Sequence, residues 1–221
     1  LMRVTEGLAE DSLVDQLVLN ALDTMQWMRD RLDIRWVLMY GRQAYEVEGK
    51  LRFWGGMIVE AVGAGKGLSD SLFEAAEHYG VEVRYGTKVE ELIVNDAGAT
   101  CGVIARGPNG REHIEARSVV MAAGGFEANT EMRTRYMGPG WEFAKVRGTR
   151  HNTGEGIRMS LDAGAQSFGH WSAGHAVAWD LNAPPTGNRI VGDLYQKHSY
   201  PLGLIVNIEG QRFVDEGADM R

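Results

Sequence analysis

The chain has 221 residues, of which 44% are hydrophobic, and a formal net charge of -7 at pH 7. The acidic balance argues against a general affinity for nucleic acid or anionic membranes, and no apolar run is long enough to span a bilayer. The first residues lack the apolar core of a signal peptide. We therefore expect a cytoplasmic protein with one large or two small domains.

The single cysteine and the spacing of the other metal-binding residue types bear on redox and metal chemistry. Cys101 alone cannot form an internal disulfide or a cysteine-based metal cluster. It lies in a predicted strand without a basic neighbour, so an inert buried thiol is expected. No pair of His, Asp or Glu residues shows the spacing of metal ligands, and we predict no metal site.

The first part of the chain alternates helical and extended patterns. Apolar residues at helical spacing predict a helix over about residues 12–32. Short extended pieces are expected over 36–54. The glycines at 63–67 then lead into a second helix, which Gly80 ends. Alternating residues at 81–85 predict a strand.

Three further strands are predicted next, because turn residues separate short extended runs. The runs are 88–95, 101–106 and 111–116, with turns at 97–98 and 107–110. Strands joined by such short turns pair with their neighbours in sequence. The pattern therefore predicts a small antiparallel meander.

A short apolar run, residues 118–123, follows the meander and stops at Gly124 and Gly125. Its length and turn signal are typical of a strand buried on both faces. The glycines allow the backbone to approach whatever lies beyond the strand, where nucleotide-like ligands bind in open α/β sheets. A core strand that ends in a glycine turn explains the same residues, so this run alone leaves the ligand open.

The remaining elements are shorter. A helix is predicted over 130–137, stopped by a Gly-Pro-Gly sequence, and another helix opens at 153–156 and continues to Gly164. The last part of the chain is expected to contain loops, short strands and a hairpin over 204–214.

Several segments, in this order along the chain, resemble the fumarate reductase/succinate dehydrogenase flavoprotein family. They are Gly-Val-Glu-Val-Arg-Tyr-Gly-Thr-Lys-Val at 80–89, Ala-Ala-Gly-Gly-Phe-Glu-Ala-Asn at 122–129, Asn-Thr-Gly-Glu-Gly-Ile-Arg-Met at 152–159, Asp-Ala-Gly-Ala at 162–165, and Gly-Leu-Ile-Val-Asn-Ile-Glu-Gly-Gln-Arg-Phe-Val-Asp-Glu at 203–216. Each segment alone is a weak signal, whereas their common order along the chain is a strong one.

The resemblance implies a fold and a division into domains. The fold class is α/β, α+β in part: an incomplete FAD-binding domain with a parallel sheet and the antiparallel meander, plus the start of an α+β capping domain. The family's Gly-x-Gly-x-x-Gly loop does not occur in this sequence. Residues 1–168 are therefore expected to form the FAD-binding domain without its N-terminal βαβ unit. Residues 169–221 are expected to form part of the substrate-capping domain.

The resemblance also implies a reaction. Residues 174–180 and 216–221 are most similar to the tricarballylate dehydrogenase branch of the family. This branch implies oxidation of tricarballylate to cis-aconitate, with hydride transfer to FAD and an unidentified electron acceptor. The alternatives are a relative of fumarate reductase or 3-ketosteroid dehydrogenase, and a non-catalytic α/β fragment that binds nothing or serves as an interaction module.

The family's cofactor-binding positions carry over onto eight residues of this chain. They are Val89, Gly124, Gly125, Phe126, Thr153, Gly154, Glu155 and Gly156. For Gly154 and Gly156 the alternative is an ordinary loop and helix N-cap, and the match of the flanking residues favours the cofactor role. For catalysis, His175 lies near the family's substrate-binding histidine, and Arg221 near its proton-transferring arginine. Because arginine is hard to deprotonate in water, we interpret Arg221 as a member of a proton relay.

A polycarboxylate substrate requires cationic side chains, and arginine's planar group fits carboxylates bidentately. In an acidic chain these cations must be concentrated locally. The second half of the sequence offers Arg189, Arg212, Arg221, His151, His170, His175 and His198. Of these, we expect Arg212 to be structural and His170 and His198 to be ordinary packed or surface residues, whereas Arg189 fits either interpretation.

Overall fold

The computed structural model describes residues 1–3, 5–53, 57–192, 194–197 and 202–217. The chain divides into two compact units: Asp11–Tyr85 is one, and Leu1–Glu10 with Gly86–Arg221 form the other. The fold class is mixed helix and strand, as expected, and all the described strand pairs are antiparallel. The predicted boundary after residue 168 stays a prediction.

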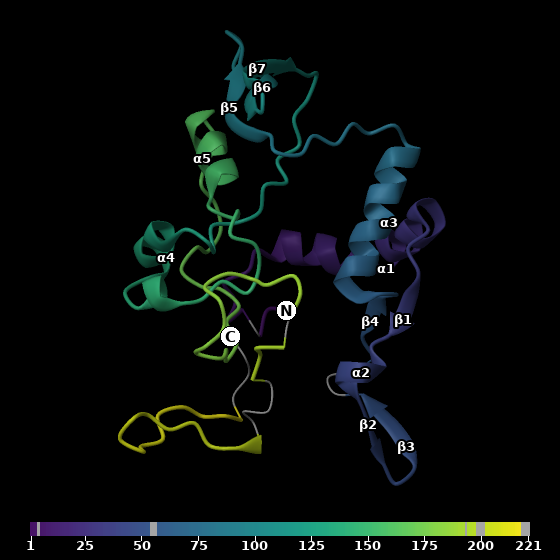
Figure 1. The fold of residues 1–221 in the computed structure, drawn as a ribbon, viewed down its shortest axis with the longest axis vertical. Coiled ribbons are helices and arrows are strands. Elements are labelled where there is room, and N and C mark those ends of the chain that lie inside the picture. Colours follow the sequence, from purple (N-terminus) through teal and green to yellow (C-terminus); the bar gives the residue numbers. More distant parts are fainter. Residues whose placement is uncertain (4, 54–56, 193, 198–201, 218–221) are drawn as a thin grey trace. The chain divides into compact units, whose positions relative to one another are not determined.

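The described residues of the unit Asp11–Tyr85 form three helices and two antiparallel strand pairs. Its elements, labelled in Figure 1, are α1 (Asp11–Leu32), β1 (Trp36–Leu38), α2 (Tyr40–Gln43), β2 (Ala44–Val47), β3 (Lys50–Phe53), β4 (Val59–Ala61) and α3 (Ala64–His78). The predicted first and second helices are confirmed as α1 and α3. The Trp36 ring nitrogen donates to the carbonyl of Met25 at 3.2 Å, which ties β1 to α1. Ile34, 1% exposed, is the buried residue between them.

The strand predicted at 81–85 is wrong, because the structure leaves this segment without strand pairing. Its alternating pattern, Val-Glu-Val-Arg-Tyr, suits a half-buried strand, yet a strand also needs a neighbour that shares its hydrogen bonds. Among the described residues, no segment pairs with it. Val81 is 56% exposed and Tyr85 74% exposed.

Two glycines in α3 provide a matched pair for a stability test. A Cβ atom at Gly67 would lie 1.9 Å from the carbonyl oxygen of Val62, whereas one at Gly65 would meet nothing within 4 Å. We expect Gly67→Ala to destabilise the chain by about 1–3 kcal/mol through this overlap. Gly65→Ala should instead stabilise it by about 0.4–1 kcal/mol. Urea unfolding of both variants measures the difference, and equal midpoints would contradict the close contact at Gly67.

In the part of the second unit that the structure describes, the chain forms the meander and three short helices. Its elements are β5 (Lys88–Val94), β6 (Thr100–Gly107), β7 (Gly110–Glu115), α4 (Thr130–Met137), the 3-10 helix η1 (Trp141–Phe143) and α5 (Glu155–Asp162). The predicted meander is confirmed, with strand order β5-β6-β7. Ala105 in the central strand is fully buried, and Gly102 lies so close to β7 that a Cβ would be 2.4 Å from the carbonyl oxygen of Ile114.

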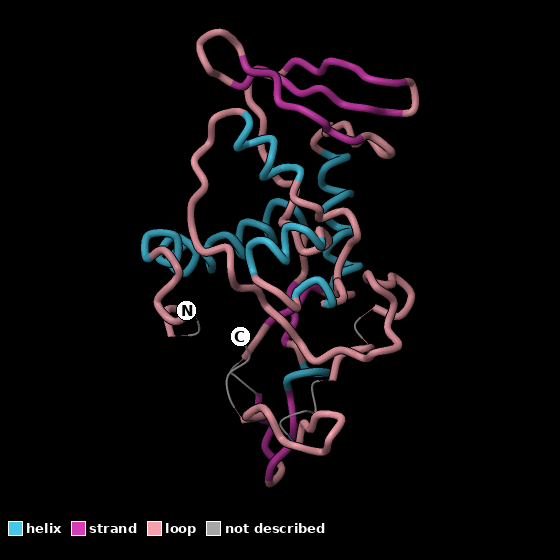
Figure 2. Tube along the Cα trace, turned by 90° about the vertical axis from the view of Figure 1, so that its left-hand side faces the viewer, coloured by secondary structure: helices cyan, strands magenta, loops and turns pink. Residues whose placement is uncertain are grey.

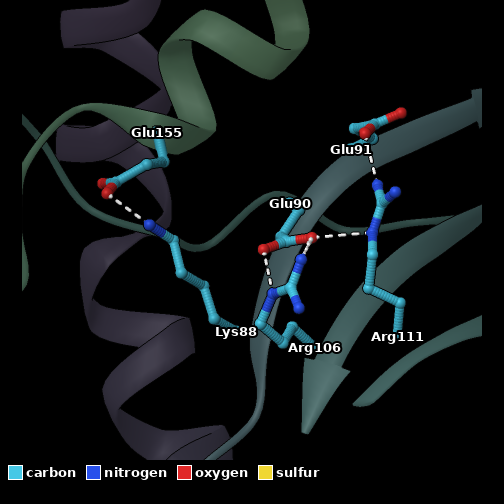
Figure 3. Close-up of polar contacts among 6 residues, drawn as sticks. All are labelled: Lys88, Glu90, Glu91, Arg106, Arg111 and Glu155. Atoms are coloured by element: carbon cyan, nitrogen blue, oxygen red, sulfur yellow. Dashed lines mark hydrogen bonds and ion pairs between the residues drawn. The ribbon is translucent and has the colours of Figure 1, made fainter.

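Ion pairs on one face of the meander link its three strands. Figure 3 shows Glu90 of β5 between Arg106 of β6, at 2.7 Å, and Arg111 of β7, at 2.9 Å. Arg111 also reaches Glu91 at 2.5 Å. The hydrogen bond from Arg106 is the main reason that the pKa of Glu90 lies below its ordinary value. These ion pairs therefore add cross-strand contacts to the main-chain pairing of the meander.

The buried strand predicted at 118–123 is also wrong as a description of this structure. The segment forms no strand, and Val120 is 89% exposed. An apolar strand of a parallel sheet is stable only when flanking strands pair with it. No described segment of this chain does so. The hairpin predicted at 204–214 appears only as an isolated bridge between Val206 and Arg212, within long loops (pink in Figure 2).

Across the described ranges, no helix combines the length and apolar character needed to cross a membrane.

Candidate functional site

Two glycine-containing loops, 124–127 and 152–155, are joined by main-chain hydrogen bonds. The N–H of Gly154 donates to the carbonyl of Gly125 at 3.1 Å, and the N–H of Ala128 donates to the carbonyl of Asn152 at 2.9 Å. Most of the predicted cofactor-binding residues lie in these two loops. The structure therefore brings together segments that are separated in the sequence.

Asn129 fixes both loops to the start of α4. Its side-chain oxygen accepts from the N–H of Met132 at 3.0 Å, which caps the helix. Its side-chain nitrogen donates to the carbonyl of Thr153 at 2.9 Å. One side chain thus orients the helix and the second loop at once.

The glycines of these loops are required by the protein's own packing. Gly124 and Gly154 have φ angles of +72° and +83°, which residues other than glycine rarely adopt. A Cβ at Gly154 would lie 2.5 Å from the Met132 sulfur, and one at Gly156 would lie 2.7 Å from the Ala123 Cβ. Backbone conformation and packing within the protein therefore suffice to explain these glycines, and contact with a ligand would be an additional role.

Unused main-chain donors in the first loop are the observation that points to a ligand. Within the described residues, the N–H groups of Gly124, Gly125 and Phe126 donate to no protein acceptor. Consecutive N–H groups in a left-handed turn form a concave site that suits anionic or acceptor groups. The loop can therefore accept an anionic or hydrogen-bond-accepting group, and its assignment to FAD stays a prediction.

Glu155, at the start of α5, connects the second loop to the meander. Its carboxylate accepts from the Thr153 hydroxyl and lies 3.1 Å from the ammonium of Lys88 (Figure 3). Lys88 precedes Val89, which pairs with Ala105 across β5 and β6. All three predicted cofactor-binding segments therefore meet in one region. The hydrogen bond from Thr153, followed by the N–H of Glu155 itself and Lys88, lowers the pKa of Glu155 to about 2.

The low pKa of Glu155 predicts a pH-dependent stability. A carboxyl group whose pKa falls from 4.5 to about 2 on folding stabilises the chain fully above 4.5, and this contribution is lost as the pH falls through 2. We expect the difference in unfolding free energy between the parent chain and Glu155→Gln to be constant above about pH 5 and to vanish toward about pH 2. Urea unfolding across this range measures it. The stability difference caused by Glu155→Gln should shrink more in a Thr153→Val background than in a Lys88→Met background. The reverse order would contradict the assignment of Thr153 as the main cause of the low pKa of Glu155.

A cavity of about 920 Å³ lies next to the first loop, entirely within the second unit. Three predicted site residues line it: Gly125, Phe126 and His175. The rest of the lining comes from Glu127, α4, η1, α5, the segment 144–148 and the segment 170–181. His170, which contacts the Ser172 hydroxyl at 3.0 Å, also lines the cavity.

Arg133 is a buried cation in the cavity wall, with 6% of its surface exposed. Its guanidinium donates to the carbonyls of Glu127, Trp141 (2.9 Å), Glu142 (3.3 Å) and Ala144 (3.2 Å). Its described partners are thus all main-chain oxygens. The side chain links the first loop to the segment around η1, and its charge is not neutralised by a carboxylate among the described residues.

The cavity lining is more positive than the chain as a whole. Arg133, Lys145 and Arg147 contribute three cations, whereas Glu127 and Asp180 contribute two carboxylates. With histidines counted as neutral, the lining has a formal charge of +1 in a chain of net charge -7. The lining therefore favours an anionic ligand.

Lys145 and Asp180 differ in how their charges are compensated. The Lys145 ammonium donates to the carbonyls of Leu181 and Ala183. Asp180 pairs with Lys197 at 2.8 Å, and the hydrogen bond from Lys197 is the main reason that its pKa is lowered. Asp180 is thus already neutralised by a neighbour, whereas the partners of Lys145 among the described residues are carbonyl oxygens.

The other residues predicted to bind the substrate through positive charge do not line the cavity or lie outside the described residues. Arg221 and His198 lie outside the described residues, and Arg189 is exposed and does not line the cavity. Arg212 pairs with the buried Glu216 at 2.6 Å, in accord with a structural role. The N–H of Ile205, together with Arg212, lowers the pKa of Glu216 to about 2.

Sequence reasoning missed the three cations of the cavity wall. Arg133, Lys145 and Arg147 lie in the same second half of the chain as the predicted cations, but they belong to no motif of the resemblance. The only sequence signal was indirect. Asn129 as a helix cap places Arg133 one turn into α4, on the side of the helix that carries the capped loop.

The fold is shared with structurally known flavoproteins. The open conformation of a flavocytochrome c3 fumarate reductase superposes with a TM-score of 0.60 and 26% identity, over 75% of this chain and 28% of that chain. Among curated proteins, a probable fumarate reductase of Shewanella frigidimarina is 30% identical over 69% of this chain and 25% of its own length. The 3-oxosteroid 1-dehydrogenase of Mycobacterium tuberculosis is 30% identical over 70% of this chain and 27% of its own length.

These likenesses define a class, that of FAD-dependent oxidoreductases similar to fumarate reductases and ketosteroid dehydrogenases. The family model described as FAD binding domain matches residues 1–221, and the chain belongs to this family. The expected family and the expected cofactor, FAD, are thereby confirmed. The chain spans about a quarter of the length of the curated relatives named here.

Proposed function

We propose that this chain is part of an FAD-dependent dehydrogenase that oxidises a carbon–carbon single bond next to a carboxylate. The sequence resemblance names a polycarboxylate, tricarballylate, as the first substrate to test, with cis-aconitate as the product. An electron acceptor of unknown identity then reoxidises the flavin. The reaction removes a hydride from one carbon and a proton from its neighbour.

One observation carries the proposal: the cofactor loops and a positive cavity share the same residues. Gly125 and Phe126 belong to the first glycine loop and also line the cavity, beside Lys145 and His175. A substrate in the cavity would therefore lie against the loop that offers N–H groups to the cofactor. Such adjacency is what hydride transfer between substrate and flavin requires.

The residues of the chain have separate roles in this proposal. Val89, the first loop and residues 153–156 hold FAD, which supplies hydride acceptance when it is bound. His175 donates a hydrogen bond to a substrate carboxylate, and the cations of the cavity wall attract the anion. Arg221 relays the substrate proton. The segment from residue 169 onward forms part of a cap that restricts water.

An absorption spectrum tests the proposal directly. The purified chain is mixed with FAD, passed through a desalting column, and measured before and after addition of tricarballylate. We expect a retained flavin band that bleaches with substrate. His175→Asn should require more tricarballylate for the same bleaching, whereas the control His113→Asn, in the exposed part of β7, should behave like the parent chain.

Each outcome has a defined meaning. A retained band that does not bleach with tricarballylate but bleaches with a 3-ketosteroid would assign the steroid alternative, and bleached FAD reoxidised by fumarate would favour a fumarate reductase relative. No retained flavin, in this chain and in a version extended at both ends, would overturn the proposal in favour of a non-catalytic fragment.

A further inference from the structure

The carbonyl groups and the N–H groups of the first glycine loop are used differently. The three consecutive carbonyls of residues 125–127 accept hydrogen bonds from the protein, whereas the N–H groups of residues 124–126 donate to no acceptor among the described residues. The donors to the carbonyls are, in order, the N–H of Gly154 at 3.1 Å, the N–H of Asn129 at 2.8 Å, and the Arg133 guanidinium. The protein thus satisfies the acceptors of the loop and leaves a run of donors for a ligand.

Arg133 is the side chain among these donors, and it carries a charge. Its guanidinium is buried, and its described partners are four main-chain carbonyls. Carbonyl dipoles offset the cost of burying a full charge only in part. The carboxylate of Glu127, whose carbonyl Arg133 holds, instead accepts from the Asn152 amide at 2.5 Å. An anion bound at the loop would therefore lower the cost of burying this cation.

The number of donors offers a structural explanation for the same arginine. Four carbonyls exceed the two donor hydrogens of an asparagine or glutamine side chain, and the guanidinium has five. Arg133 could therefore be required for the fold alone. A role toward a ligand is separated from this by variants that keep a donor at residue 133 and differ in charge.

We propose that Arg133 is the positioning residue of an anion site at the first glycine loop. By holding the carbonyl of Glu127, it keeps the N–H groups of residues 124–126 in one arrangement, and its charge favours an anionic ligand there. FAD is the anionic ligand that the proposed function supplies, and this assignment rests on the proposed function. The anion site itself does not depend on it.

Two ligands test the site, FAD and inorganic pyrophosphate, each titrated into the complete chain by isothermal titration calorimetry. Arg133→Lys keeps the charge and can still hold one carbonyl, so it should bind both ligands within about threefold of the parent chain. Arg133→Gln keeps a donor without the charge and should bind both at least tenfold more weakly. Arg135→Met removes one exposed positive charge from the same helix and should bind like the parent chain.

Gly67→Ala controls for a loss of stability. This substitution lies in the other compact unit, and its overlap with the Val62 carbonyl is expected to destabilise the chain as well. Its affinities for FAD and pyrophosphate should equal those of the parent chain. Circular dichroism of each variant under the conditions of the titration verifies that the chain is folded when its affinity is measured.

The results distinguish this inference from the proposed function. Equal affinities in Arg133→Lys and Arg133→Gln, or no pyrophosphate binding by the parent chain, would overturn the inference. The same weakening in Gly67→Ala would assign the effect to stability and overturn it as well. Pyrophosphate binding that depends on the charge at residue 133, in a chain that retains no flavin even when extended at both ends, would support the anion site while the proposed function fails. A retained flavin that bleaches with tricarballylate, together with unchanged affinities in Arg133→Gln, would support the proposed function and overturn the inference.

Discussion

Replacing Arg133 with methionine is expected to destabilise the chain by about 1–3 kcal/mol, the cost of leaving a buried acceptor without its hydrogen bond. The guanidinium is the common donor to four carbonyls, and the methionine side chain cannot donate to any of them. Since small domains have total stabilities of about 5–15 kcal/mol, this loss is a large fraction of the whole.

The matched control is Arg135→Met in the same helix. Arg135 is exposed and lies over the Tyr136 ring, 5.6 Å from its centroid, so its removal should cost about 0.5–1 kcal/mol. Urea unfolding followed by circular dichroism measures both variants. Similar midpoints for the two would show that the four carbonyls are solvated without Arg133, and would contradict its role as the link between the cavity walls.

Arg133→Lys separates charge from geometry. Lysine keeps the positive charge but offers a single compact ammonium, which cannot reach carbonyls from residues 127, 141, 142 and 144 together. We expect an intermediate stability and a cavity that still prefers anions. A lysine variant as stable as the parent chain would show that charge alone, and not the planar donor group, holds the two segments together.

The elements that could be predicted from the sequence are those whose signals are local. The helix α1 follows from apolar spacing, the end of α4 from the Gly-Pro-Gly sequence that stops it, and the meander from its glycine-containing turns. The predicted strands at 81–85 and 118–123 failed for a common reason. A strand is completed by a neighbour elsewhere in the chain, and neither Val83 nor Val120 has one among the described residues.

The candidate site also contains parts with a local sequence signal and parts that depend on tertiary contacts. The glycine loops could be predicted because glycine at positive φ leaves a recognisable pattern in sequence, as at Gly124 and Gly154. The meeting of the loops through Gly154 and Gly125, and the arrival of Lys88 beside Glu155, depend on tertiary hydrogen bonds that no spacing encodes. Arg133 is the clearest case, because its partners are main-chain carbonyls and carry no sequence signature at all.

Substituting Gly154 with alanine is expected to combine two costs and to disrupt cofactor binding. The φ angle of +83° costs an alanine about 1–2 kcal/mol. The new Cβ would also lie 2.5 Å from the Met132 sulfur and 3.1 Å from the Phe126 Cβ, an overlap worth about 1–3 kcal/mol. The strain falls on the hydrogen bond between Gly154 and Gly125, which joins the two loops.

Comparison with Gly169→Ala isolates the packing cost of Gly154→Ala. Its φ angle is +85°, almost the same as that of Gly154, but a Cβ there would meet nothing within 4 Å. Both variants should therefore lose the backbone contribution, and only Gly154→Ala should lose packing as well. Urea unfolding gives the stabilities, and a titration with FAD followed by flavin fluorescence gives the affinities.

Because Met132 and Phe126 must shift when the alanine enters, the first loop can no longer present its N–H groups in the same arrangement. We expect flavin affinity to fall at least tenfold in Gly154→Ala and to stay at the parent value in Gly169→Ala. A Gly154→Ala chain that is destabilised yet binds flavin normally would show that the loop junction supports the fold and not the cofactor.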